Sequence, residues 1–284
     1  MAFALIILSS CISLVEGICI KKYNSRRSEG GFAFTGLISL FAMLFFCFKN
    51  TGGFQFPSGL WGYGILAGIM YCSASFLTYL ALQYGSFALS MLILSYSLVF
   101  SVGYGLIFLQ EPATVYTYLG LGLVMISLYL TRGEKKESDK SFSVKWLICI
   151  VLSAAGSGMF SVCMRMQQIR YNDACSDEFM IIALGFSAIV LLMVGFIKDR
   201  RGFKVIIKYG SFYAIGAGVS NGIANMLGLV VTMLIPISLS APVSAGVKMV
   251  LSFIVSMLFF KERFIKRQVV GVFLGTIALI LLNL

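Results

Sequence analysis

The sequence has 284 residues, of which 59% are hydrophobic and 12% charged, and its mean hydropathy is +0.95. A soluble domain carries about 25% charged residues, so this chain has too little polar surface to cover its apolar residues in water. The absence of histidine excludes imidazole bases and His-ligated metals. The net charge of +11 does not imply a nucleic-acid partner, because membrane proteins carry basic residues in short cytoplasmic loops. The composition therefore predicts an integral membrane protein.

Apolar runs long enough to cross a bilayer recur along the whole chain. A hydrocarbon core about 30 Å thick needs roughly 17–25 apolar residues per helix. The ten predicted spans are 3–20, 32–48, 60–82, 87–109, 114–131, 146–164, 179–197, 210–234, 238–260 and 268–284. The first span resembles a lipoprotein signal near Cys11, but it lacks the basic start of a signal peptide, so we expect it to remain as a helix. The connections are too short to form a globular domain.

An internal repeat divides the chain into two halves. The pattern Leu-Ser-x3-Ser-x5-Cys-x-Lys/Arg ends at Lys21 in the first span and at Arg165 in the sixth, an offset of 144. The third and eighth spans share an Ala-Gly pair, which begins at Ala67 and at Ala217, an offset of 150. The fourth and ninth spans are both followed by a carboxylate, at an offset of 151. These offsets indicate two related units of five helices.

Because five is an odd number, the second unit crosses the membrane in the opposite sense to the first. Inverted repeats of this kind are typical of transporters, which bind their substrate near the midplane between the halves. The predicted fold is an all-α integral membrane protein, with ten transmembrane helices as two inverted five-helix repeats around a central cavity. The predicted units are residues 1–137 and 146–284, joined by a basic linker at 138–145.

Basic residues collect in the connections that follow the odd-numbered spans. These connections hold 18 lysines and arginines, whereas the other connections hold three. The positive-inside rule places the basic connections in the cytoplasm and both chain ends outside. The sequence therefore predicts a multi-pass protein of the cell membrane in that orientation.

Polar residues inside the spans are candidates for a binding site, because a polar side chain that faces lipid is costly. Lys248 lies 10 residues from Ser238 and 13 from Lys261, or roughly 15–20 Å from either helix end, which is too deep for its ammonium to reach water. The predicted substrate-binding residues are Lys248, Asn221, Asn225, Ser244, Tyr71, Ser75, Tyr96 and Ser157. The alternative for the serines is helix packing, since small hydroxylated residues let helices approach closely.

Glu16 is the only carboxylate well inside a span, and it is the predicted site of proton coupling. It lies five residues from Lys21, or about 7.5 Å from that helix end, so it could also reach the interface. Its depth differs from that of Lys248 by about 12 Å on the same geometry. We therefore expect no direct Glu16–Lys248 ion pair.

In each unit, one carboxylate follows the fourth helix and a glycine comes nine residues later. In this pattern the chain resembles the EamA family of the drug/metabolite transporter superfamily. These family markers are Glu111, Gly120, Glu262 and Gly271, together with the segments Pro242–Gly246 and Phe259–Arg263. From the residues alone, we expect the two carboxylates to cap helix N-termini. The resemblance implies a transporter, although its members usually have both ends in the cytoplasm. Carriers of sugar nucleotides and phosphate esters in this superfamily place a lysine in the ninth helix, where Lys248 lies.

The predicted function is secondary transport of a small metabolite or drug-like solute by alternating access, and not catalysis. No Walker A loop, HExxH or G-x-S-x-G motif occurs. The alternatives are an integral membrane enzyme that acts on a lipid or prenyl substrate, an anionic or sugar-type solute carrier of the same superfamily, and a channel. The seven cysteines form no CxxC pair, and we expect no disulfide, metal or cofactor. The expected partners are the solute and the bilayer, without nucleic acid; the oligomeric state is left open.

Overall fold

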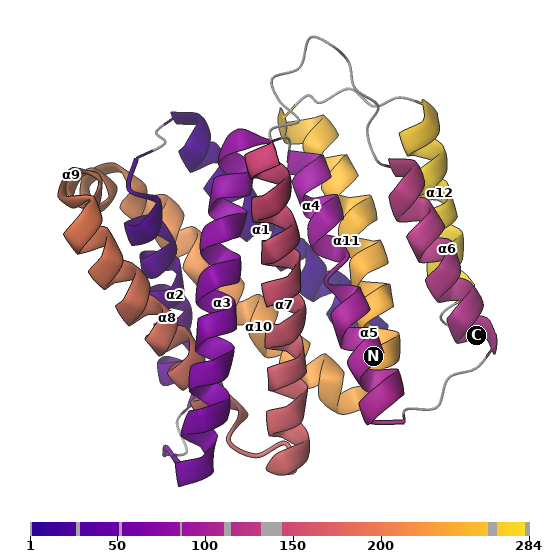
Figure 1. Ribbon diagram of the computed structural model, residues 1–284, viewed down its shortest axis with the longest axis horizontal. Helices are drawn as coiled ribbons and strands as arrows, with labels where there is room; N and C mark the ends of the chain where they lie inside the picture. Colours follow the sequence, from indigo (N-terminus) through magenta and orange to yellow (C-terminus); the bar gives the residue numbers. More distant parts are fainter. Residues whose placement is uncertain are drawn as a thin grey trace.

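The computed structural model describes residues 2–26, 29–50, 53–85, 87–110, 115–131, 144–260 and 266–281. These residues form helices and short connections, and none of them lies in a strand (Figure 1). The helices are α1 (Ala2–Arg26), α2 (Gly31–Lys49), α3 (Ser58–Tyr84), α4 (Phe87–Ser95), α5 (Leu98–Phe108), α6 (Val115–Thr131), α7 (Val144–Arg170), α8 (Ser176–Lys198), α9 (Arg200–Val205), the π-helix η1 (Ile206–Gly210), α10 (Ser211–Leu234), α11 (Ile237–Phe260) and α12 (Lys266–Leu281).

The prediction of an all-helical membrane protein is confirmed. Within the described residues, seven helices are long and apolar enough to cross a membrane. Each predicted span coincides with a helix or, for 87–109, with the pair α4 and α5. The span count among the described residues is lower than the predicted ten because 87–109 is divided in two, and because the described parts of α6 and α12 are 17 and 16 residues long.

The predicted continuous helix over 87–109 is interrupted between Ser95 and Leu98. The amides of Tyr96 and Ser97 bond to the carbonyls of Ile93 and Leu94, three residues earlier instead of four. This pattern tightens the backbone into a 3₁₀-type turn and separates α4 from α5. The apolar run gave no sign of the break, because hydropathy reports burial and not backbone hydrogen bonding.

The predicted loop at 198–209 is also largely helical. Asp199 caps the start of α9 by accepting a 2.8 Å hydrogen bond from the Gly202 amide. Its other carboxylate oxygen accepts a 3.0 Å hydrogen bond from the Gly30 amide, at the start of α2. One carboxylate therefore fixes two connections that follow odd-numbered spans at the same end of the molecule.

Helices from the two halves of the chain pack against each other throughout. The main pairs are α1 with α10, α2 with α8 and α10, α3 with α7 and α8, and α6 with α12. At Gly218, an added Cβ would lie 2.7 Å from the backbone oxygen of Ile38, so α10 can cross α2 this closely only with glycine there. Helix α11 contacts α1, α4, α5 and α12, and completes the bundle.

The described helix ends that flank the basic connections gather at one end of the bundle. Lys22, near the end of α1, lies over the ring of Phe259 near the end of α11, and Arg26 lies over Tyr213 near the start of α10. In Figure 1 this is the upper end, where α9 and the start of α12 lie, opposite the marked C-terminus. The other end holds an ion pair between Lys49 and Asp177.

Candidate functional site

A cavity of about 360 Å³ lies between the two halves of the chain. Helices α1, α2, α3, α7, α10 and α11 line it, together with residues of α4 and α5 around their junction. The polar side chains in its wall are Ser9, Ser13, Glu16, Thr35, Tyr71, Ser75, Thr78, Ser95, Ser97, Ser101, Ser157, Ser161, Asn221, Asn225, Thr232, Ser240, Ser244 and Lys248. The cavity therefore combines a hydroxyl-rich wall with one cation and one carboxylate.

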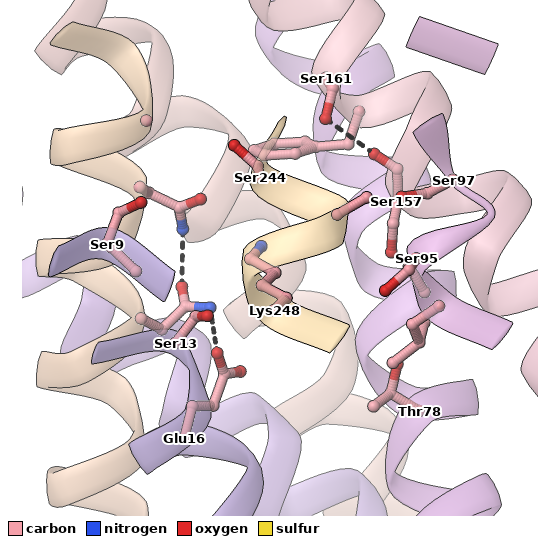
Figure 2. Close-up of a pocket in the computed structure, with 18 of the residues that line it drawn as sticks. Ser9, Ser13, Glu16, Thr78, Ser95, Ser97, Ser157, Ser161, Ser244 and Lys248 are labelled. Carbon is pink, nitrogen blue, oxygen red and sulfur yellow. Dashed lines mark hydrogen bonds between the residues drawn. The ribbon is translucent and has the colours of Figure 1, made fainter. Parts of the chain in front are cut away.

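Lys248 reaches from α11 into the middle of this cavity (Figure 2). Ser9, Ser13 and Glu16 of α1 stand on one side of it, and residues of α3, α4 and α7 on the other. Its side chain is exposed, and it borders the cavity. Among the described residues, no hydrogen bond or ion pair to Lys248 is present, so its three donors are available to a solute or to water.

Asn221 connects three helices through a buried hydrogen-bond network. Its Nδ2 donates to Oε2 of Glu16 at 2.9 Å, while its Oδ1 accepts from the hydroxyl of Tyr71 at 2.9 Å. The same Oδ1 accepts from Nδ2 of Asn225 at 2.8 Å. Figure 2 shows this chain of contacts ending at Glu16. Asn221 therefore holds the Glu16 carboxylate in the cavity wall, with one oxygen used and the other open to a further donor.

Glu16 and Lys248 face the same cavity without forming a direct pair. The carboxylate is bonded to Asn221, whereas Lys248 projects from α11 into the same cavity. Among the described residues, no ion pair joins Glu16 to Lys248, and the expectation that they do not pair directly stays a prediction. A solute that entered this space would meet a positive and a negative group on different walls.

Most cavity serines bond to their own helix. The hydroxyls of Ser9, Ser13 and Ser75 each donate to the carbonyl three residues earlier, and Ser161 donates to the carbonyl of Ser157. Such bonds use the hydroxyl hydrogen and leave oxygen lone pairs for a donor in the cavity. The arrangement is compatible with packing and with weak polar contact to a solute.

Of the eight predicted substrate-binding residues, the structure brings seven into the cavity wall: Lys248, Asn221, Asn225, Ser244, Tyr71, Ser75 and Ser157. Tyr96 is the exception. It packs beside the apolar cluster that contains Val243 and Met249 and does not line the cavity. Their binding roles stay predictions.

Thr35, Ser95 and Ser240 are among the polar residues of the wall that sequence reasoning did not single out. Ser240 lies one turn before Ser244, so the register of α11 could have indicated it. Ser95 lies at the break in the predicted fourth span, which the sequence did not reveal. Of the family markers, Ser244 and Ala245 in the segment Pro242–Gly246 line the cavity. Gly271, which accepts a hydrogen bond from Ser127 on α6, and the buried Gly120 do not line it. Glu111 and Glu262 lie outside the described residues.

A multi-pass helical membrane protein with a polar cavity between its halves is the class that this structure defines. Residues 1–133 match the model of the EamA-like transporter family, a family of the drug/metabolite transporter superfamily. The match covers 133 of the 284 residues, and over these residues it confirms the resemblance inferred from the sequence motifs.

The fold recurs in solved structures. Among them, 28 chains match, and one crystal structure superposes with a TM-score of 0.66 at 14% identity. That alignment covers 96% of this chain and 98% of the other, so the two share their fold over almost their whole lengths. A search of curated proteins gave no match.

Proposed function

We propose that the protein is a secondary transporter that moves a small metabolite or drug-like solute by alternating access. The observation that carries this proposal is Lys248, a cation without a hydrogen-bond partner among the described residues, in a cavity between two halves of a membrane protein. An ionisable group at such depth needs a partner or a use, and a solute supplies the partner.

The proposed architecture is two inverted five-helix units around the cavity. Helix packing supports it: α1 runs along α10 as α7 runs along α3, and α2 packs on α10 as α8 packs on α3. The two units can be compared by exchanging each helix with its counterpart: α1 with α7, α2 with α8, and α3 with α10. This exchange turns each of these packed pairs into another packed pair. The family match over residues 1–133 covers one such unit.

The interrupted helix at the cavity also favours transport. Discontinuous helices are common at transporter binding sites, because a break exposes backbone groups and helix ends to the solute. Ser95, Ser97 and Leu98, at the break between α4 and α5, all line the cavity. Their place in the wall supports a role for this break in solute binding.

The proposed solute carries an anionic or strongly hydrogen-bond-accepting group that contacts Lys248. Asn221, Asn225 and Ser244 line the same cavity and are proposed to bind its polar parts. Glu16 is proposed to carry the proton if transport is proton-linked, because its carboxylate faces the same space. For orientation, we propose that the basic connections face the cytoplasm and that both termini lie outside.

Solute counterflow in proteoliposomes tests the proposal. Purified protein is first screened by thermal shift against metabolites, since a ligand that binds only the folded state stabilises it. The best stabiliser is then used, radiolabelled, in counterflow. Saturable counterflow with wild-type protein and its loss in Lys248→Met support a carrier. Turnover of added lipid without counterflow would instead indicate a membrane enzyme and overturn the proposal.

A further inference from the structure

Two side chains of α1 reach the C-terminal end of α3 at the basic end of the molecule. Lys21 donates through Nζ to the carbonyl oxygen of Leu82 at 2.9 Å, and also to that of Gly85. Asn24 donates through Nδ2 to the carbonyl of Tyr79 at 3.1 Å. The last carbonyls of a helix lack intrahelical donors and favour a cation, so α3 offers a suitable end for this contact. We call these two residues the basic-end latch.

Two side chains of α7 make the corresponding contact at the opposite end. Arg165 donates through Nη1 to the carbonyl of Thr232 at 2.8 Å, close to the end of α10. Gln168 donates through Nε2 to the carbonyl of Leu229 at 3.1 Å. We call Arg165 and Gln168 the far-end latch.

The two latches are the same device, repeated. The donors Lys21 and Arg165 are 144 residues apart, as are Asn24 and Gln168. The acceptors Leu82 and Thr232 are 150 residues apart, as are Tyr79 and Leu229. These are the offsets found between the first and sixth spans and between the third and eighth. Each latch therefore joins the first helix of its unit to the third, through the same pair of contacts.

The latches join helices that otherwise share little surface. Helix α1 packs mainly along α10 and α3 mainly along α7, while the α1–α3 and α7–α10 interfaces are small. The cavity wall includes Ile20 and Thr78 beside the basic-end latch, and Met164 and Thr232 at the far-end latch. One latch therefore lies at each end of the cavity. Each latch joins the group formed by α1 and α10 to the group formed by α3 and α7.

Each latch is also incompletely hydrogen-bonded. The side-chain oxygens of Asn24 and Gln168 are buried and have no hydrogen-bond partner among the described residues. A buried acceptor without a donor is unfavourable, and water can bond to it when the contact opens. Opening either latch therefore costs less free energy than opening a contact whose polar atoms are all hydrogen-bonded.

We propose that the basic-end latch and the far-end latch are the two gates of the cavity, and that they open in alternation. The proposal rests on the transport function proposed above. Both latches are closed in this structure. When the α1–α10 group tilts against the α3–α7 group, one end of the cavity widens while the other is pressed shut. A variant that lacks one latch then spends more time open at that end, with the other latch closed.

Hydrogen–deuterium exchange of the purified protein, read by mass spectrometry without added solute, tests the gates. Lys21→Met should raise the exchange rate in the peptide that covers residues 79–85 by at least about threefold and lower it in the peptide 229–234 by a similar factor. Arg165→Met should give the opposite pattern. The double variant Lys21→Met/Arg165→Met lacks both latches, so neither end is favoured. The ratio of the exchange rates of the two peptides should then return to near its wild-type value.

Two controls separate a gate from a structural contact. Lys21→Arg keeps a cationic donor and should preserve the wild-type pattern. Lys49→Met removes the ion pair to Asp177 at the far end, between the tightly packed α2 and α8, so its effect should stay local. If Lys21→Met fails to fold, Asn24→Leu weakens the same latch and is read in the same way.

Reciprocity is the deciding result. If Lys21→Met and Arg165→Met raise exchange only near the substitution, or at both ends together, the latches are structural contacts and the proposal is wrong. The measurement requires no solute, so it is independent of the counterflow test. Reciprocal exchange without counterflow would overturn the proposed transport function while leaving the two-gate motion in place.

Discussion

Tyr71 donates a 2.9 Å hydrogen bond to Asn221, which lies 150 positions further along the chain. The same offset separates Ala67 from Ala217, so the two bonded residues occupy equivalent positions of the third helix in each proposed unit. In an inverted repeat, equivalent positions can touch only close to the axis that relates the halves. The contact therefore supports an axis through the cavity wall, where one unit supplies a phenol and the other an amide.

Lys248→Met should reduce counterflow by at least about tenfold, because a hydrogen bond from a charged group contributes about 1.5–3 kcal/mol. The protein should unfold at the same temperature as wild type or higher, since an intramembrane cation costs about 2.5–3.5 kcal/mol. Lys204→Met is the matched control, because Lys204 is exposed on α9, away from the cavity. Wild-type counterflow in Lys248→Met would show that the lysine is tolerated and not used.

Asn221→Leu should destabilise the protein more than Asn225→Leu. The first change leaves Tyr71, Asn225 and Glu16 without their shared partner, whereas the second removes one donor from Asn221. Each buried polar group left unpaired costs about 1–3 kcal/mol, so the difference should be several degrees in thermal unfolding. Equal melting temperatures for the two variants would mean that water replaces the network.

Glu16→Gln should abolish solute accumulation driven by a pH gradient while leaving solute exchange measurable. The amide oxygen of glutamine can still accept from Asn221, so the fold should persist, but the side chain can no longer take up a proton. Uptake with and without an imposed pH gradient, in the same liposomes, provides the measurement. Accumulation that still follows the gradient in Glu16→Gln would remove this residue from the coupling mechanism.

The proposed orientation can be read from cysteine labelling in a variant whose seven native cysteines have been replaced. A single cysteine at Ser138, in the basic linker, should be protected from an impermeant maleimide in intact cells. A cysteine at Asn172, exposed in the connection between α7 and α8, should be labelled. The reverse pattern would place both termini in the cytoplasm, the arrangement that the EamA resemblance implies.

Composition and periodicity alone established the membrane class, the positions of the helices, and the polar faces of α1, α3, α10 and α11. Burial in lipid demands long apolar runs, and polar side chains at i and i+4 must share one helix face, so both properties are written locally. The offsets of the repeat are also visible in the sequence. They relate the donors of one latch to the donors of the other, and the acceptors of one latch to the acceptors of the other.

Contacts between distant segments were decided only by the tertiary structure. Nothing local to Asn24 or Gln168 indicates that each donates to a carbonyl of another helix, because a backbone acceptor carries no side-chain signature. The break between α4 and α5 was equally hidden, and so was the position of Tyr96 outside the cavity wall. Hydropathy reports which residues avoid water, whereas backbone hydrogen bonding and helix packing determine where each side chain points.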